Sequence, residues 1–144
     1  MEQPPHEPRI VVLVGLPGSG KSTYLARRGV SGLSSDAVRR LLADDETDQT
    51  IHHQVFATLR CLLRRRLSLA RPVTYLDATH LTVRERRPYI RMGQLLSCRV
   101  EAVYFDVPLE VCLERNRGRA RVVPEEVLRR MAGRLVPPSI EEGF

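Results

Sequence analysis

This 144-residue sequence has little of what marks several classes of protein. Its three cysteines, Cys61, Cys98 and Cys112, show no metal-ligand spacing and cannot all pair as disulfides, so we expect a reducing, cytoplasmic environment. No apolar run approaches the ~20 residues that a membrane span needs, and no signal-peptide pattern precedes the first apolar segment. We therefore expect no membrane partner.

Lysine is also nearly absent. Lys21 is the only lysine among 23 cationic residues, and the others are all arginine. A compact ammonium fits between phosphates where a planar guanidinium does not, which makes this position a candidate phosphate contact. The net charge of +6 favours acidic ligands such as nucleotides or nucleic acid, and it equally aids solubility.

The segment around Lys21 matches the phosphate-loop pattern G-x-x-x-x-G-K-[ST] at every fixed position. An apolar run over residues 10–14 leads in and a helix-compatible segment over residues 22–28 leads out, as the motif requires. Glycines let successive N–H groups point at an anion, and the helix N-terminus adds its positive end. The residues that we expect to bind a nucleoside triphosphate are Gly15, Pro17, Gly18, Ser19, Gly20, Lys21, Ser22 and Thr23.

Within this loop, Lys21 is expected to reach the β and γ phosphates of ATP, and the Ser22 hydroxyl to ligate Mg²⁺. The alternative is a glycine-rich turn between a strand and a helix that binds nothing.

Apolar periodicity predicts one α/β domain over residues 9–144, after a flexible proline-rich arm at residues 1–8. The expected strands are 9–14, 30–34, 73–76 and 100–107; the expected helices are 22–28, one from Ala37, 49–69, 83–96, 109–115 and one from Pro124. This alternation implies a three-layer α/β fold with a parallel sheet, in which ligands bind at the carboxyl ends of the strands. Lys21, Asp36, Asp77 and the arginine run 115–121 should converge there.

Several of these residues have a second interpretation. Asp36 could cap the helix that begins at Ala37, and Asp77 could be a strand-end loop residue rather than a group that orders Mg²⁺-bound water. Each arginine of the run 115–121 fits a solvated surface as well as a catalytic site, although together, around Gly118, they favour a lid. The arginines within 49–69 favour a solvated face over a nucleic-acid patch.

Four segments besides the loop carry a family likeness: Ser34-Ser35-Asp36-Ala37-Val38-Arg39, Asp77-Ala78-Thr79, Cys112-Leu113-Glu114-Arg115-Asn116-Arg117-Gly118-Arg119 and Glu142-Gly143-Phe144. In these the sequence resembles the P-loop kinase domain of bacterial polynucleotide kinase-phosphatase enzymes, which phosphorylate the 5′-OH ends of RNA or DNA. The resemblance covers roughly residues 9–144. It implies a three-layer P-loop kinase fold with a parallel sheet of about four strands in the order 2-3-1-4, helices on both faces and an arginine-rich lid.

The resemblance also implies roles for individual residues. The aspartate matching Asp36 is the general base for the acceptor hydroxyl, and the arginine matching Arg39 holds the acceptor phosphate. The arginines matching Arg115 and Arg119 clamp the donor phosphates from the lid. Each role is physically reasonable, because a base must lie near the attacking hydroxyl and phosphoryl transfer depends mainly on charge neutralisation.

We further assign Asp77 and Thr79 to the substrate site, and we expect Asp36 and Asp77 to assist Ser22 in holding Mg²⁺ through water. Two features depart from the family. His80 stands where these kinases often carry asparagine, and the sequence stops at Phe144, where the family usually continues into a final strand.

The sequence therefore predicts an ATP-dependent kinase whose acceptor is the 5′-OH end of a nucleic acid, with other repair modules, absent from this sequence, as partners. A P-loop kinase for a small-molecule hydroxyl shares the loop, the aspartate and the lid, and remains an alternative. A nucleotide-binding switch is the second alternative, but no glutamine or asparagine follows Asp77 to position a water.

Overall fold

The computed structural model of the chain describes residues 7–144. The arm expected at residues 1–8 lies mostly outside the described residues. Its last residue, Pro8, is held against the sheet, because its carbonyl accepts a hydrogen bond from the Arg99 N–H at 3.1 Å.

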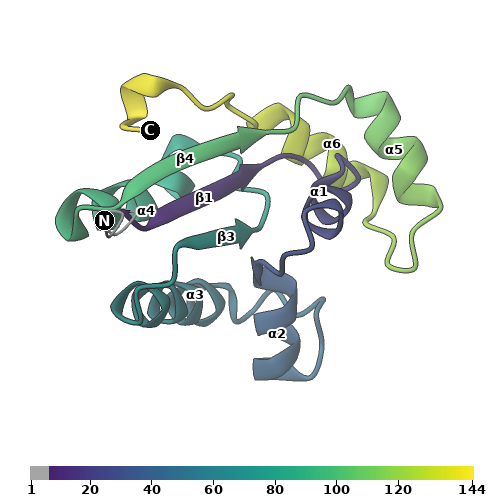
Figure 1. Cartoon of the computed structure of the whole chain (residues 1–144). Helices are drawn as coiled ribbons and strands as arrows, with labels where there is room; N and C mark the ends of the chain where they lie inside the picture. The colour runs from purple at the N-terminus through teal and green to yellow at the C-terminus, as the bar shows by residue number, and fades with distance from the viewer. Residues whose placement is uncertain (1–6) are drawn as a thin grey trace.

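A four-stranded parallel sheet forms the centre of the fold (Figure 1). Its strands are β1 (Arg9–Val14), β2 (Leu33–Ser34), β3 (Val73–Asp77) and β4 (Arg99–Tyr104). They lie in the order β2-β3-β1-β4, so the predicted order 2-3-1-4 is confirmed. All three pairings are parallel, which brings the carboxyl ends of the strands to one edge of the sheet.

Six α-helices and a final 3₁₀ turn are described over residues 7–144. They are α1 (Lys21–Arg27), α2 (Ser35–Ala43), α3 (His52–Ser68), α4 (Val83–Leu96), α5 (Leu109–Arg117), α6 (Glu125–Arg134) and η1 (Ile140–Glu142). Figure 1 shows α1, α5 and α6 gathered beyond the arrowheads of β1 and β4, whereas α2 and α3 lie beside β3. In the described part of the chain, no helix combines the length and the apolar character needed to cross a bilayer.

The central strand β1 is buried on both faces because its five residues after Arg9 are all apolar. Alternate residues point to opposite sides of a strand, so β1 contributes to two separate cores. One core joins Ile10, Val12 and Val14 to α3 and α4 through Leu63, Tyr89 and Ile90. The other joins Val11 and Leu13 to α1 and β3 through Leu25 and Tyr75. This gives the three layers that the sequence predicts.

Strand lengths are set by the neighbouring strands. We expected β4 to reach residue 107, but its ladder ends at Tyr104 because its partner β1 turns away into the phosphate loop after Val14. In the same way β2 is limited to Leu33 and Ser34, which pair with the last two residues of β3. Helix α4, in contrast, has the predicted bounds, and a capping box between Thr82 and Glu85 starts it.

A buried ion pair joins the last turn of the chain to α4. The Arg86 side chain is fully buried, and its Nε and Nη2 donate to the two carboxylate oxygens of Glu142 at 2.8 and 2.9 Å. Arg86 Nη1 also donates to the carbonyl of His80, just after β3. The pair therefore connects η1, α4 and the segment that follows β3.

Replacing Glu142 by alanine would leave the buried Arg86 charge without its carboxylate. Because breaking such a pair is costly, we expect Glu142→Ala to lower the free energy of unfolding by about 3–5 kcal/mol. Glu141→Ala removes an exposed carboxylate from the same turn and should change the free energy by less than about 0.5 kcal/mol. Denaturant unfolding followed by circular dichroism measures both, and equal midpoints for the two variants would contradict this account.

Candidate active site

A cleft of about 1570 Å³ opens at the carboxyl ends of the strands. The phosphate loop and the start of α1 form one wall, and the end of β2, α2 and the end of β3 form another. The third wall is the lid, residues 115–124, which comprises the end of α5 and the segment that joins it to α6. Of the residues that the sequence predicts to bind a ligand, the following line this cleft: Pro17, Gly18, Gly20, Lys21, Ser22, Thr23, Asp36, Arg39, Asp77, Thr79, Arg115 and Arg119.

The phosphate loop adopts a backbone that other residues would not tolerate. Gly18 and Gly20 have φ angles of 82° and 106°, in the left-handed region that favours glycine. Gly15 is restricted by contact instead, since a Cβ there would meet the Phe105 Cβ at 2.9 Å. The Ser19 hydroxyl oxygen is buried beneath the loop and has no hydrogen-bond partner within residues 7–144. A glycine-rich loop that also offers an unpaired hydroxyl, that of Ser19, fits a bound phosphate chain.

The ammonium of Lys21 is held by the loop itself. Its Nζ donates to the carbonyls of Gly15 and Leu16 at 2.8 and 2.9 Å. Burial lowers the pKa of Lys21 to about 8, and the nearby Asp77 carboxylate opposes this shift only in part. The site therefore contains a desolvated cation that a phosphate group would stabilise.

Asp36 lies in the first turn of α2 but does not cap the helix. The N-cap is Ser34, whose hydroxyl accepts a hydrogen bond from the Ala37 N–H at 3.2 Å. The capping interpretation of Asp36 is therefore wrong, because the helix begins two residues earlier than expected. The Asp36 carboxylate instead contacts two guanidinium groups, that of Arg39 at 3.5 Å and that of Arg121 at 2.9 Å.

Arg39 is an unusually buried arginine. It is 4% exposed, although it lines the cleft, and its neighbour Arg40 is exposed. Its contact with Asp36 is at the limit of a hydrogen bond, and its Nε has no partner among the described residues. A guanidinium has five N–H donors, and burying them unpaired is costly. Arg39 thus offers unused donors to a ligand in the cleft.

Asp77, the last residue of β3, and Thr79, two residues beyond it, both line the cleft. Burial raises the pKa of the Asp77 carboxyl, while the Lys21 ammonium lowers it in part. The Thr79 carbonyl accepts a hydrogen bond from the Gly15 N–H at 3.0 Å, which ties this segment to the phosphate loop. The strand end therefore positions a carboxylate next to the loop lysine.

Mg²⁺ needs few protein ligands when phosphates and water complete its shell. Over the described residues, no three His, Cys, Asp or Glu side chains gather as a metal cage. Ser22, Asp36 and Asp77 nevertheless all line the cleft, and they supply the oxygen ligands that Mg²⁺ prefers. The donor set fits an ion that is bound together with a nucleotide.

The lid is folded back toward the loop by a buried asparagine. Asn116 is fully buried, and its side-chain amide donates to the Val123 carbonyl and accepts from the Val123 N–H, at 2.6 and 2.9 Å. Arg115 Nη1 donates to the Gly18 carbonyl at 3.2 Å. Arg119 and Arg121 also line the cleft, whereas Arg117 pairs with Glu125 at 2.9 Å. The arginine run is therefore divided between the cleft and the surface.

Sequence reasoning missed part of the cleft. The loop between α2 and α3 and the start of α3 contribute Thr47, Gln49 and His52, and α6 contributes Arg130. No motif marks these residues, because the packing of α3 and α6 brings them to the cleft. Arg121 belongs to the predicted arginine run, but its contact with Asp36 had no sequence signal.

His80, whose role the sequence left open, lies behind the loop. It is 3% exposed, and its Nδ1–H donates to the Leu13 carbonyl at 2.6 Å. Burial lowers the pKa of His80 to about 4, so the ring is neutral near pH 7. A neutral ring bonded to the end of β1 supports the loop from below.

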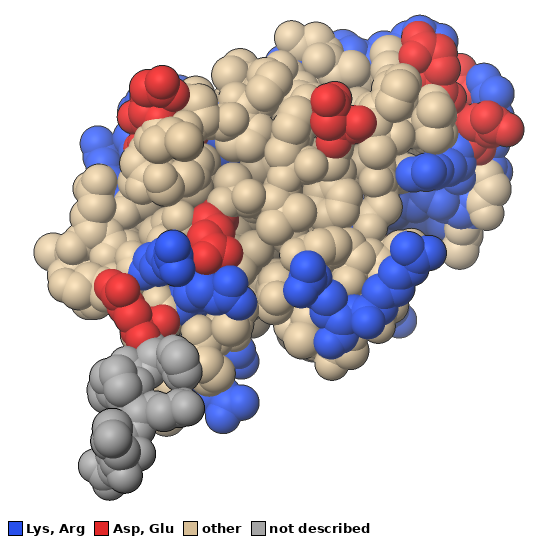
Figure 2. All heavy atoms as spheres, turned by 45° about the horizontal axis from the view of Figure 1, so that its top comes forward, with Lys and Arg blue, Asp and Glu red and all other residues tan. Residues whose placement is uncertain are grey.

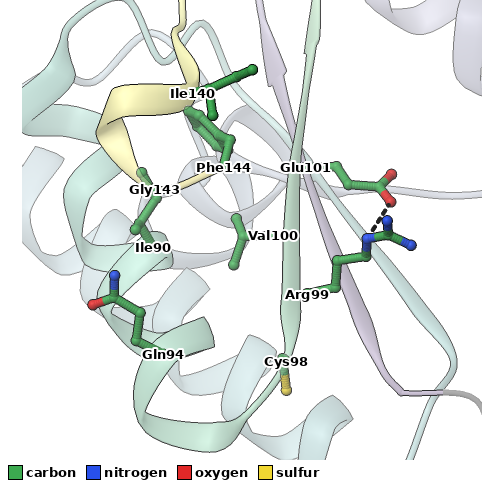
Figure 3. A pocket seen from close by; sticks show the side chains of 9 residues that line it. All are labelled: Ile90, Gln94, Cys98, Arg99, Val100, Glu101, Ile140, Gly143 and Phe144. Atoms are coloured by element: carbon green, nitrogen blue, oxygen red, sulfur yellow. Dashed lines mark ion pairs between the residues drawn. The ribbon is translucent and has the colours of Figure 1, made fainter.

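A second hollow of about 480 Å³ lies over β4, away from the loop (Figure 3). Ile140 and Phe144 of the closing segment lie on one side of the strand, and the paired Arg99 and Glu101 side chains lie on the other (Figure 3). It contains none of the residues that line the phosphate loop.

Comparison with known protein families identifies the architecture. The model of the AAA domain matches residues 10–138. The chain belongs to this family. Its fold is that of the P-loop kinases, which confirms the fold that the resemblance implies. No protein of curated function matches the sequence.

Solved structures share the fold at low identity. A chain of the Pnkp1/Rnl/Hen1 RNA repair complex is 20% identical, with a TM-score of 0.76 over 90% of this chain and 44% of that one. An APS kinase of Mycobacterium tuberculosis, bound to AMPPNP and APS, is 24% identical (TM-score 0.56; 78% and 70% covered). A gluconokinase from Sinorhizobium meliloti 1021 is 19% identical (TM-score 0.60; 92% and 78% covered).

These likenesses show the P-loop kinase fold and leave the acceptor undetermined, because the three proteins are named for different substrates. The chain spans less than half the length of the RNA repair chains that it matches.

The partly buried Lys21 leads to a prediction for nuclear magnetic resonance. Because Lys21 is the only lysine, selective ¹³C-lysine labelling gives one ε-carbon signal. We expect it to titrate with a pKa of about 8 in the free protein. Binding of Mg²⁺-ATP should raise that pKa by about one unit or more, because phosphate charges favour the ammonium.

The unfolded protein in urea is the control, and its lysine should titrate near the ordinary value of about 10.4. An unchanged pKa on adding nucleotide would contradict a phosphate next to Lys21.

Proposed function

We propose that this AAA domain is an ATP-dependent kinase that transfers the γ-phosphate to the 5′-OH end of a polynucleotide. The observation that carries the proposal is Arg39, a buried arginine with an unpaired Nε, one helical turn from the Asp36 carboxylate and in the same cleft as the phosphate loop. The cleft thus offers a donor site, a candidate base and a second anion site.

On the donor side, the loop backbone and Lys21 bind the β and γ phosphates. Arg115 and Arg119 extend from the lid toward the same loop, and Arg115 already contacts Gly18. Their positive charges offset the negative charge of the transferring phosphoryl group. Ser22 would hold Mg²⁺, with Asp36 and Asp77 assisting through water, and the ion would supply further charge neutralisation.

On the acceptor side, Asp36 accepts the proton of the attacking hydroxyl and Arg39 holds the phosphate next to it. Asp77 and Thr79 line the floor between the two sites. A 5′-OH polynucleotide end has both features, because its terminal nucleoside carries a 5′-hydroxyl and a 3′-phosphate. An acceptor held at one or two phosphates needs no long basic groove, and this agrees with Arg64 and Arg65 of α3 being exposed and outside the cleft.

The comparisons support this choice without deciding it. The RNA repair complex contains Pnkp1 together with Rnl and Hen1, which supports separate repair modules as partners. A kinase for a small-molecule hydroxyl is the second candidate, because an APS kinase and a gluconokinase share the fold.

The candidate base leads to the first mutational prediction. Asp36→Asn should lower kcat by about 100-fold, because general base catalysis is worth that much, and should leave ATP affinity nearly unchanged. The helix keeps its Ser34 cap, so the variant should stay folded, although loss of the carboxylate charge beside the buried Arg39 should lower its thermal stability. Asp106→Asn is the matched control, because Asp106 also follows a strand of the sheet but is exposed outside the cleft. Full activity in Asp36→Asn would exclude the base.

The acceptor is tested by two neighbouring arginines. Arg39→Met keeps the apolar stem and removes the cation, so we expect it to raise the KM for a 5′-OH oligonucleotide about 10- to 100-fold and to spare the KM for ATP. Arg40→Met changes an exposed neighbour and should leave both constants as they are. Transfer of ³²P from ATP to 5′-OH DNA, 5′-OH RNA and a panel of small alcohols measures this. Efficient phosphorylation of a non-ionic alcohol by Arg39→Met would end the polynucleotide assignment.

A further inference from the structure

The proposed base is already engaged in the structure. Arg121 of the lid reaches across the cleft, and its Nη1 lies 2.9 Å from Oδ2 of Asp36. The other carboxylate oxygen faces Arg39 at 3.5 Å. The Asp36 side chain is half exposed, whereas that of Arg121 is 28% exposed. Both oxygens of the carboxylate are therefore next to cations before any hydroxyl arrives.

The two contacts are unequal. The Arg121 contact is the shorter ion pair, at 2.9 Å, whereas the Arg39 contact is a hydrogen bond at the 3.5 Å limit. Arg39 is buried with its Nε unpaired among residues 7–144, so Asp36 satisfies it poorly. A phosphate has more acceptor oxygens than a carboxylate and matches the guanidinium fork, so it would be the better partner for both arginines.

We propose that Arg121 is a specificity-determining residue, which holds the Asp36 carboxylate until a phosphate of the acceptor binds Arg39 and Arg121. This inference rests on the proposed function. The acceptor's phosphate takes the guanidinium of Arg121 and frees the carboxylate. A hydroxyl compound without an anion leaves the Asp36–Arg121 pair closed, so the cleft selects acceptors that carry a phosphate next to the hydroxyl.

The transfer step then balances without another reactant. The acceptor hydroxyl gives its proton to the freed Asp36 carboxylate, and its oxygen forms a bond to the γ phosphorus of ATP. The bond between that phosphorus and the β–γ bridging oxygen breaks, and ADP leaves with the electron pair. Asp36, now a neutral carboxylic acid, returns its proton to water and pairs again with Arg121.

Two acceptors that differ only in one phosphate test the role of Arg121. A nucleoside and its 3′-monophosphate both offer a 5′-hydroxyl, and the ratio of their kcat/KM values measures the discrimination. For Arg121→Gln we expect this ratio to fall at least about tenfold, the value of one hydrogen bond to a charged group. The fall should come from a lower kcat/KM for the monophosphate and an equal or higher one for the nucleoside, with the KM for ATP unchanged.

Arg117→Gln is the matched control. Arg117 lies in the same lid and forms an ion pair of the same length, 2.9 Å, but with Glu125 outside the cleft. This variant should keep the wild-type ratio. Arg121→Lys, which keeps a cation, should restore part of the discrimination that Arg121→Gln loses.

The outcomes separate the two proposals. A wild-type protein that phosphorylates 5′-OH oligonucleotides, combined with an unchanged ratio in Arg121→Gln, overturns the role of Arg121 alone. An equal loss on both acceptors also overturns it, because it indicates a lid that merely folds less well. A wild-type protein that phosphorylates no 5′-hydroxyl overturns the proposed function, and with it this inference.

Discussion

Two cations with too few anions around them, the partly buried Lys21 and the buried Arg39, organise the cleft. Lys21 is bonded to backbone carbonyls with its pKa lowered to about 8, and Arg39 is 4% exposed with an unpaired Nε among the described residues. Burying positive charge without a partner is unfavourable, so the fold must compensate this cost elsewhere. The nearby carboxylates Asp36 and Asp77 compensate only part of it. A ligand that brings phosphates to both positions would relieve the imbalance, which is the physical basis of the kinase proposal.

The rest of the fold holds these cations in place. Strand β1 is buried on both faces and leads directly into the phosphate loop. At the end of β1, the Gly15 N–H donates to the Thr79 carbonyl, and the His80 ring donates to the Leu13 carbonyl. Arg86 of α4 pairs with Glu142 and also donates to the His80 carbonyl, which fixes the segment after β3. The surface around this frame is positive overall, and Figure 2 shows arginine side chains gathered in patches with acidic groups scattered over the face. The overall charge favours a polyanion, and under the proposed function the cleft holds the end of one.

Much of the frame was predictable because it depends on local patterns. The β1 run, the loop and the caps of α4 are each encoded within a few residues, and the strand order followed from the family resemblance. The strand ends were not predictable, since the bounds of β2 and β4 depend on where β3 and β1 stop. The division of the arginine run also required the structure. Which of its arginines face the cleft depends on Asn116 binding Val123, and on the position of α2 opposite the lid.

The central claim is that one cleft aligns a nucleoside triphosphate and a 5′-hydroxyl around Asp36. The most direct test is a crystal structure of the chain with a non-hydrolysable ATP analogue, Mg²⁺ and a 5′-OH dinucleotide. We expect the triphosphate at Lys21, the 5′-oxygen within about 3.2 Å of the Asp36 carboxylate, and the adjoining phosphate at Arg39 with the Asp36–Arg121 pair open. A dinucleotide bound away from Asp36, or an Asp36–Arg121 pair still closed over it, would contradict the account.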